Sequence, residues 1–244
     1  MSGKEKIVAM IPARIGSTRL PMKNLALIDG APMISYAIMA AKKSGVFDRV
    51  VINGDDPLFG RIAERYGVEF YLRPKELGSS TTKSDFVVQD FMLKHPADIL
   101  CWVNPTSPLQ TGSEIRAVVE YFLQEELDTL ITVNREQVHA SFQGRPINYN
   151  RDEVFAQTQD LVPVDVFVYS VMAWRNKAFL AEFNKKGQAF FVGKFGVYPV
   201  SKMSGIIIKR KEDLKLVESI VKSLKDSGSD TLCYDPLVEE RAHG

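Results

Sequence analysis

A basic stretch that contains glycine, IPARIGSTRLPMKN, spans residues 11–24 and follows an apolar run over residues 7–10. Its residues with possible chemistry are three cations, a glycine and a serine: Arg14, Arg19, Lys23, Gly16 and Ser17. A connecting loop gains no stability from crowding like charges, because they repel one another. A glycine in a strand-to-helix turn lets backbone N–H groups approach a phosphate, and nearby Arg and Lys side chains neutralise its charge. The stretch therefore predicts a polyphosphate site, the alternative being a solvated basic loop.

This stretch differs from the two common phosphate-binding signatures. It lacks the G-x-x-x-x-G-K-[ST] spacing of a P-loop and the G-x-G-x-x-G spacing of a dinucleotide-binding fold. The chain of 244 residues carries a formal net charge of only +1. This balance argues against a nucleic-acid coat or a membrane-surface protein, so the cluster of cations is a local feature that suits a small anion.

Alternating strand-like and helical segments predict the elements that must position this loop. Apolar runs indicate strands over residues 6–11, 49–52, 69–71, 99–103 and 129–133. Helical spacing indicates helices over residues 32–44, 58–66, 84–94, 113–124 and 212–225. Ser84 and Asp85 are the expected cap of the third helix. Repeated βαβ units predict an α/β fold with a doubly wound, mostly parallel sheet, in which ligands bind beyond the carboxyl ends of the strands.

The middle of the chain departs from this alternation. Residues 137–160 are polar and turn-rich, residues 164–173 are strongly β-forming, and residues 197–209 suit one or two more strands. We interpret residues 1–244 as a single domain that contains a small β insertion over 137–200, and we expect that insertion to serve dimerisation.

Few residues are available for metal or redox chemistry. Cys101 and Cys233 lie far apart and the three histidines are scattered, which disfavours a zinc site. The apolar runs are shorter than the roughly 18 residues that a membrane span requires, and the charged start MSGKEK does not resemble a signal peptide. We therefore expect a cytoplasmic protein without nucleic-acid or membrane partners.

The basic stretch resembles the opening signature of the sugar-acid cytidylyltransferases, the family that makes CMP-sialic acid and CMP-Kdo. Its residues that match the acylneuraminate branch are Arg14, Gly16, Ser17, Arg19, Lys23 and Asn24. Further segments that resemble the family are Tyr66-Gly67, RPKEL at 73–77, NPTSPL at 104–109, Gln159-Asp160 with Pro163, and KEDL at 211–214. The match covers most of the chain and implies the family's nucleotide-diphospho-sugar transferase-like fold.

This resemblance implies a nucleotidyltransferase that moves CMP from CTP to the anomeric hydroxyl of a sugar acid and releases pyrophosphate, for lipopolysaccharide or capsule biosynthesis. It implies that Arg14 and Lys23 hold triphosphate oxygens, with N–H groups around Gly16 and Ser17 assisting. Asn24 is implied to face the nucleotide. Two further implied positions are Ser84, near the base, and Asn104, where the acylneuraminate branch has glutamine.

The family binds Mg²⁺ with a D-x-D pair ahead of its last helix, and the corresponding positions here are Ile207 and Lys209. Magnesium needs oxygen ligands, which these side chains do not supply, so the metal ligands are undefined and the activity is in question. Lys209 is a candidate for replacing part of the metal's charge. Asp55 and Asp56 are the nearest acids after a strand, with capping of the helix that starts near Leu58 as the alternative.

The acceptor side also departs from the family. Gln159 is retained from its RQD-x-P stretch, but Thr158 replaces the arginine. The Tyr and Asn-Gly that follow in the family are replaced by Asp165, Val168 and Tyr169. Asp165 indicates a hydroxyl- or amine-bearing acceptor, or else a structural acid bonded to backbone groups.

Three hypotheses follow from the sequence. The protein is an active cytidylyltransferase for a sialic-acid-like acid, a catalytically impaired nucleotide-binding paralogue, or a cytidylyltransferase with another acceptor, such as an aminated sugar acid or a phosphonate. The expected partners are CTP, a small acidic acceptor and a second copy of the chain, and the expected cofactor is Mg²⁺. The homodimer is predicted from the apolar residues 164–173, the alternative being burial of that strand within its own monomer. Trp102 and Trp174 are expected in the core.

Overall fold

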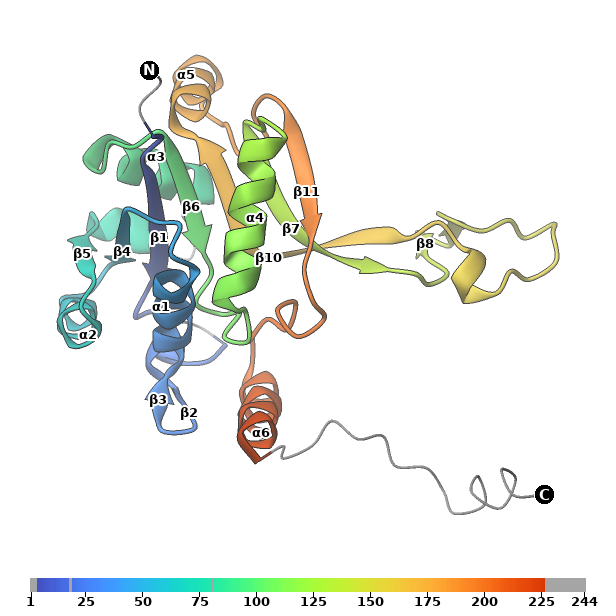
Figure 1. Cartoon of the computed structure of the whole chain (residues 1–244), viewed down its shortest axis with the longest axis horizontal. Coiled ribbons are helices and arrows are strands. Elements are labelled where there is room, and N and C mark those ends of the chain that lie inside the picture. Colours follow the sequence, from blue (N-terminus) through green and yellow to red (C-terminus); the bar gives the residue numbers. More distant parts are fainter. Residues whose placement is uncertain (1–3, 18, 80, 227–244) are drawn as a thin grey trace.

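A seven-stranded sheet forms the centre of the protein (Figure 1) in the computed structural model, which describes residues 4–17, 19–79 and 81–226. Its strands are β1 (Ile7–Ala13), β4 (Arg49–Gly54), β5 (Glu69–Leu72), β6 (Ile99–Val103), β7 (Thr129–Glu136), β10 (Val164–Arg175) and β11 (Phe195–Pro199). Their order across the sheet is β11-β7-β10-β6-β1-β4-β5. Only β10 runs antiparallel to its neighbours in this described sheet. The predicted α/β class with a mostly parallel sheet is therefore confirmed.

Helices cover both faces of this sheet. They are α1 (Met33–Ser44), α2 (Leu58–Tyr66), α3 (Ser84–Lys94), α4 (Gly112–Gln124), α5 (Asn176–Lys186) and α6 (Lys211–Asp226). Helices α1, α2 and α4 pack on one face, and α3 and α5 pack on the other. Helix α6 instead packs against β2 (Leu27–Ile28), which pairs with β3 (Ala31–Pro32). The result is a layered body with a helical layer on each side of the strands.

The central strands are apolar on both sides because helices cover both faces. In β1, Ala9 and Ile11 belong to the core on the α1 side, whereas Val8 and Met10 belong to the core on the α3 side. Burying a large aliphatic side chain contributes about 1.5–3 kcal/mol. This burial fixes where β1 ends, and with it the point at which the basic stretch leaves the sheet, before Arg14.

Helix α3 has the predicted length but not the predicted cap. The residue at its N-cap position is Lys83. The carboxylate of Asp85 accepts hydrogen bonds from the backbone N–H groups of Ala189 (2.7 Å) and Phe190 (3.0 Å) instead. Asp85 therefore ties α3 to the segment after α5, and Ser84 is left at the end of the helix that faces the candidate site.

Between β7 and β10 the chain leaves the main body as a projection (Figure 1), which we call the arm and define as residues 137–163. Its short elements are β8 (Ser141–Phe142), β9 (Arg145–Pro146) and a 3-10 helix (Thr158–Asp160). Of the range 137–200 predicted as an insertion, only this first part stands apart, because β10 and β11 belong to the central sheet. Of residues 197–209, all within the described chain, only the end of β11 is a strand.

The apolar second half of β10 is buried between β6 and β7. This confirms the alternative given for that strand, burial within its own monomer, and removes it as an argument for a dimer. A register shift lies between Phe167 and Met172, and Tyr169 within it has a positive φ of 55°. Residues with side chains seldom adopt that conformation, so the bulge is a strained point beside the carboxyl end of β6.

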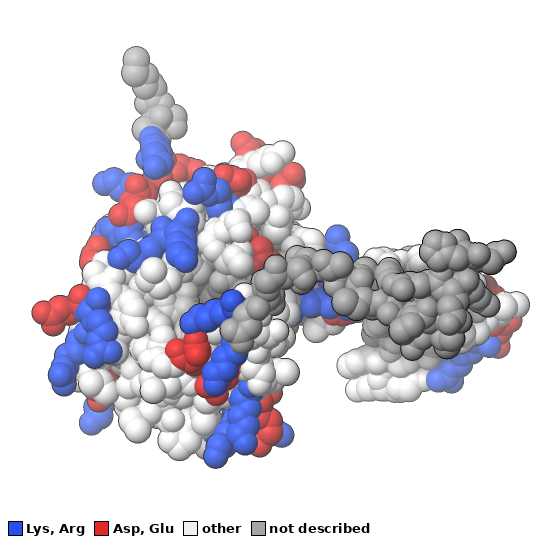
Figure 2. Space-filling model, turned by 60° about the horizontal axis from the view of Figure 1, so that its bottom comes forward, with Lys and Arg blue, Asp and Glu red and all other residues white. Residues whose placement is uncertain are grey.

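Charge is mixed in sign over the main body on the face shown in Figure 2, where Lys and Arg side chains lie among Asp and Glu side chains. A search of the described residues finds no helix with the length and apolar character to cross a membrane.

Candidate nucleotide site

A pocket of about 230 Å³ opens at the carboxyl ends of β1 and β6, where the predicted fold places ligands. We call it the strand-end pocket. It is lined by Pro12, Ala13, Arg14, Ser17, Lys23, Asn24, Arg73, Leu77, Ser79, Thr82, Ser84, Val87, Trp102, Asn104, Pro105 and Thr106. These residues come from the basic stretch, from the segment after β5 with the start of α3, and from the end of β6. Three separate parts of the chain therefore meet at one hollow.

The basic stretch forms one wall of this pocket and is held from behind. Asn24 is 5% exposed, and its Nδ2 donates to the carbonyl of Arg14 (3.4 Å). Lys23 Nζ donates to the carbonyl of Ile208 (3.1 Å). Burial, and then the charges of Arg19 and Arg14, lower the pKa of Lys23, while Asp213 opposes them. Burial is the larger cause of this lowering, and the repulsion from the two arginines adds to it. A bound anion would relieve that repulsion and favour the charged lysine.

The structure brings most of the predicted nucleotide residues together. Those that line the strand-end pocket are Arg14, Ser17, Lys23, Asn24, Ser84 and Asn104. Gly16 lies within the same loop, and a side chain added there would meet open space. Arg19 and Lys209 lie outside the lining, but their charges act on Lys23. Lys209 is exposed, and its backbone N–H donates to Asp213 (2.7 Å).

Asn104 uses its side-chain amide to shape the turn after β6. Its Oδ1 accepts from the backbone N–H (3.0 Å) and the hydroxyl (2.8 Å) of Thr106. Its Nδ2 donates to the carbonyl of Tyr169 (3.1 Å), within the β10 bulge. The amide therefore couples the pocket wall to the strained part of β10.

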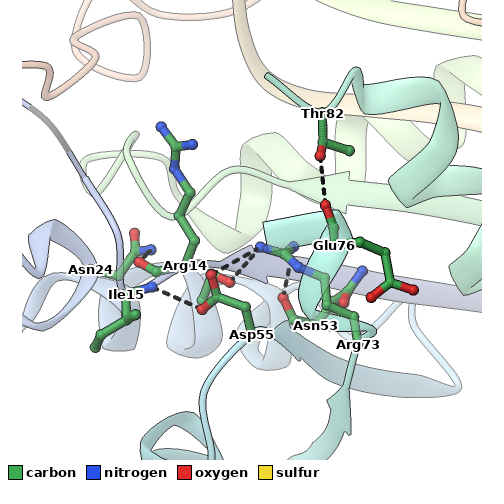
Figure 3. A network of polar contacts seen from close by, with 9 residues as sticks. Arg14, Ile15, Asn24, Asn53, Asp55, Arg73, Glu76 and Thr82 are labelled. Atoms are coloured by element: carbon green, nitrogen blue, oxygen red, sulfur yellow. Dashed lines mark hydrogen bonds and ion pairs between the residues drawn. The ribbon is translucent and has the colours of Figure 1, made fainter. Parts of the chain in front are cut away.

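Two side chains that the sequence interpretation missed or misplaced share one network of polar contacts (Figure 3), in which Arg73 lines the pocket and Asp55 does not. Arg73 is 6% exposed and donates to the carbonyls of Ala13 (3.0 Å) and Asn53 (3.3 Å). Its Nη2 lies 3.9 Å from Asp55 Oδ2. Asp55 Oδ1 accepts from the backbone N–H of Ile15 (2.8 Å). A signal existed for Arg73, because it follows a third parallel strand, whose carboxyl end must lie at the same edge of the sheet.

The acids near this site do not fit a magnesium ion held by the chain. Asp55 is engaged with Ile15 and Arg73, and Asp56 caps α2 by accepting from the N–H of Leu58 (2.8 Å). Asp213 accepts from the N–H groups of Lys209 and Arg210 at the start of α6. Within the described residues, none of those lining the pocket is acidic, and no cluster of three potential ligands occurs. Capping was thus right for Asp56, whereas Asp55 is neither a cap nor an open metal ligand.

Gln159 and Asp165 do not join the strand-end pocket. Gln159 belongs to the arm, where its carbonyl accepts from Gln137 Nε2 (2.7 Å). Asp165 accepts two hydrogen bonds from the Arg135 guanidinium (2.8 and 3.0 Å), which lower the pKa of its carboxyl. Asp165 lines a different hollow of about 650 Å³, the arm pocket, together with His139. Asp165 is therefore one half of a partly exposed ion pair with Arg135, and its hydrogen bonds go to that guanidinium where the sequence had offered backbone groups as one alternative. Its role toward an acceptor stays a prediction.

The two tryptophans differ, although both were expected in the core. Trp174 is fully buried, and its Nε1 donates to the carbonyl of Phe190 (3.0 Å). Trp102 lies on β6 and lines the strand-end pocket. The prediction is therefore confirmed for Trp174 and holds in part for Trp102, which is partly buried and packs against the core on the α3 side but also reaches the pocket where β6 ends.

The family model for cytidylyltransferases matches residues 8–202, which is most of the chain and includes every residue that lines the strand-end pocket. The chain therefore belongs to the cytidylyltransferase family.

Named relatives and a solved structure agree with this membership. The chain is 34% identical over 134 residues to an N-acylneuraminate cytidylyltransferase of Escherichia coli O18:K1:H7, covering 54% of this chain and 32% of the relative. It is 26% identical over 219 residues to the enzyme of the same name from Streptococcus agalactiae serotype V, covering 85% and 51%. The chain thus spans a third to a half of the length of these relatives.

A similar fold occurs in a CMP:2-keto-3-deoxy-manno-octonic acid synthetase that was solved in complex with CTP. The TM-score is 0.66 at 17% sequence identity, and the similarity covers 89% of this chain and 99% of that one. At this identity the likeness establishes the shared fold.

Proposed function

We propose that this protein transfers CMP from CTP to a sugar acid with release of pyrophosphate. The observation that carries the proposal is the meeting of Arg14, Lys23, Asn24 and Ser84 in one pocket at the carboxyl ends of the parallel strands. Family membership and relatives named for N-acylneuraminate support it. The same chemistry suits a role in making surface glycans such as lipopolysaccharide or capsule.

The chemistry asks the protein to place an attacking hydroxyl in line with the α-phosphorus and to stabilise charge on the phosphates. Arg14 is suited to this because its planar guanidinium can bind two phosphate oxygens. Lys23 is suited as a point charge whose protonated form a triphosphate would stabilise. Asn24 and Ser84 offer neutral polar groups for the ribose and base.

We propose that cations of the chain supply part of the positive charge that Mg²⁺, held by the D-x-D acids, supplies in the family. Ile207 and Lys209 stand at those positions, and the described pocket lining is basic and neutral. Mg²⁺ is often bound mainly by substrate phosphates and water, so under this proposal the ion accompanies CTP without a ligand from this pocket. A fixed ammonium cannot bridge two oxygens as a metal does, which makes slow turnover the expectation and keeps an impaired, nucleotide-binding paralogue as the second candidate.

The acceptor is the open part of the proposal. Asp165 pairs with Arg135, and the arginine of the family's RQD stretch is Thr158. A site with fewer cations suits an aminated sugar acid, whose amine offsets the charge of its carboxylate. A sialic-acid-like acid and a phosphonate are the alternatives.

We also propose a homodimer that pairs through the arm. Its exposed apolar side chains are Val138, Phe142, Ile147, Val154, Phe155 and Val162. Such residues are costly to leave in water when they gather on one projection. Light scattering should give twice the 27.4 kDa monomer mass at micromolar concentration, and a monomer mass at every concentration would refute the pairing.

Incubation with CTP, Mg²⁺ and a panel of acids tests the reaction, with pyrophosphate release as the readout. A sugar acid that raises release above the CTP-only control supports transfer. CTP binding without release for any acid would favour the impaired paralogue. If the protein shows no CTP binding and no pyrophosphate release, the proposal is overturned.

A further inference from the structure

We propose that Asp55 is a positioning residue of the strand-end pocket, whose carboxylate sets the basic stretch and the segment 73–79 relative to each other. One buried acid would thereby align the two ends of a bound nucleoside triphosphate. The inference rests on the proposed binding of CTP, and it assigns a function to an acid that is unavailable to a metal.

The first contact fixes the backbone of the basic stretch. Asp55 follows β4, its side chain is 8% exposed, and its Oδ1 accepts from the N–H of Ile15 at 2.8 Å. Ile15 lies between Arg14 and Gly16, where backbone N–H groups are expected to meet phosphate. An ionised acceptor makes a stronger hydrogen bond than a neutral one. This bond therefore fixes the orientation of the Ile15 peptide, beside the backbone N–H groups that are expected to bind phosphate.

The second contact joins Asp55 to the other wall of the pocket. Asp55 Oδ2 lies 3.9 Å from Arg73 Nη2, and the Arg73 side chain is 5% exposed. Arg73 also donates to the carbonyl of Ala13, the last residue of β1. Removing one charge of a buried pair leaves the other uncompensated, so a change at Asp55 disturbs Arg73 and the end of β1 together.

The third contact is steric. A Cβ added to Gly78 would lie 2.7 Å from Asp55 Oδ2 and 2.9 Å from Asp55 Cβ. The short helix Lys75–Gly78 therefore rests directly against the carboxylate. Leu77 and Ser79, on either side of Gly78, line the pocket. Any side chain at position 78 must push the carboxylate or the segment away, and a shift of the carboxylate reaches the Ile15 N–H.

The neighbouring acid supplies a matched control. Asp56 has the same chemistry one residue later, but its Oδ1 accepts from the N–H of Leu58 at the start of α2. It does not belong to the described lining of the strand-end pocket.

The test uses the full chain with inorganic tripolyphosphate and CTP as separate probes, measured by calorimetry. Asp55→Asn keeps a side-chain oxygen but removes its charge, which by itself would strengthen anion binding beside Arg73. The affinity for both probes should nevertheless fall at least tenfold, a loss that can come only from the displaced loop. Gly78→Ala keeps both charges of the buried pair and should lower the affinity for tripolyphosphate at least threefold. In Asp56→Asn the affinity for both probes should stay within twofold of the wild-type value. A merely structural role would lower the melting temperature and leave the tripolyphosphate affinity of the folded variants unchanged.

Tripolyphosphate affinity within twofold of wild type in folded Asp55→Asn would overturn the inference. If that variant does not fold, Gly78→Ala decides by the same measure. If wild-type protein binds neither probe, the proposed function fails. The rate of hydrogen exchange at the Ile15 amide then tests the positioning role independently of binding. Faster exchange in Gly78→Ala than in Asp56→Asn then supports it, and equal exchange overturns it.

Discussion

The strand-end pocket and the arm differ in how their polar side chains are held. In the pocket, Asn24 and Arg73 are buried and anchored to backbone carbonyls at the ends of central strands. In the arm the strands are two residues long, and exposed aromatic rings such as Phe155 stack on neighbours such as His139. The Arg135–Asp165 pair at its base is partly exposed.

This difference shows which half of the proposed reaction a single chain can organise. The core of the sheet fixes the strand ends within one chain, so under our proposal the monomer already forms the nucleotide half. The arm has little core of its own and projects from the main body (Figure 1). Under our proposal, the acceptor half is completed only when something covers the arm, and a second copy of the chain is the proposed cover.

The largest effect is expected for the cations of the strand-end pocket. Arg14→Ala or Lys23→Ala should weaken CTP binding by about 1.5–3 kcal/mol, the range for a hydrogen bond to a charged group. Calorimetry measures this directly. Lys222→Ala is the control, because Lys222 lies on α6 and pairs with Glu218. Unchanged affinity in both pocket variants would remove these cations from the site.

A second effect concerns the metal. Replacing Ile207 and Lys209 together by Asp should make CTP binding about tenfold more dependent on Mg²⁺, because carboxylates supply the oxygen ligands that the wild type lacks. Ile207 is partly buried, and an unpaired buried carboxylate is costly, so thermal melting must show that the variant folds. Fast, strictly Mg²⁺-dependent turnover by wild-type protein would contradict the substitution of lysine for metal.

A smaller effect should follow pH through Lys23. Its folded pKa is lowered, by burial first and by Arg19 and Arg14 next, whereas the unfolded chain keeps the ordinary value of 10.5. Between these two values the unfolded state binds more protons, so the free energy of unfolding of free protein should rise with pH there.

Triphosphate favours the charged form of Lys23, so CTP affinity should fall by at most about tenfold per pH unit above the lowered pKa. Calorimetry from neutral pH toward 10.5 measures this slope, with Lys23→Gln as the comparison. An equal slope in that variant would assign the effect to another group.

The smallest effect is expected in the arm. Asp165→Asn should change the free energy of unfolding by less than about 1 kcal/mol, because the ion pair with Arg135 is partly exposed to solvent. Denaturant unfolding measures the stability. We expect pyrophosphate release to stay near wild type, and a loss of more than tenfold would return Asp165 to the acceptor site.

Contiguous features of the sequence predicted the fold and one wall of the site. The apolar runs of β1 and β6 require burial on both faces, and the basic stretch contains Arg14 to Asn24 without a gap. Because the basic stretch directly follows β1, the position of β1 in the sheet is enough to place this wall of the pocket.

Contacts between side chains of neighbouring strands could not be predicted from the sequence, because they depend on which strands pair and in which register. Asp55 reaches Ile15 because β4 lies beside β1 and both strands end together. Asp165 meets Arg135 because the two residues are directly opposite in the antiparallel pair of β10 and β7, where side chains are close enough to interact. From the sequence alone, a ligand role and a structural role both stayed open for Asp55 and for Asp165.

The central claim is that CTP occupies the strand-end pocket, and amide NMR during a CTP titration tests it most directly. The account predicts shifts at residues 14–24 and 73–84, with amides of the arm unchanged at low protein concentration. Shifts confined to the lining of the larger arm pocket, around His139 and Asp165, would contradict it.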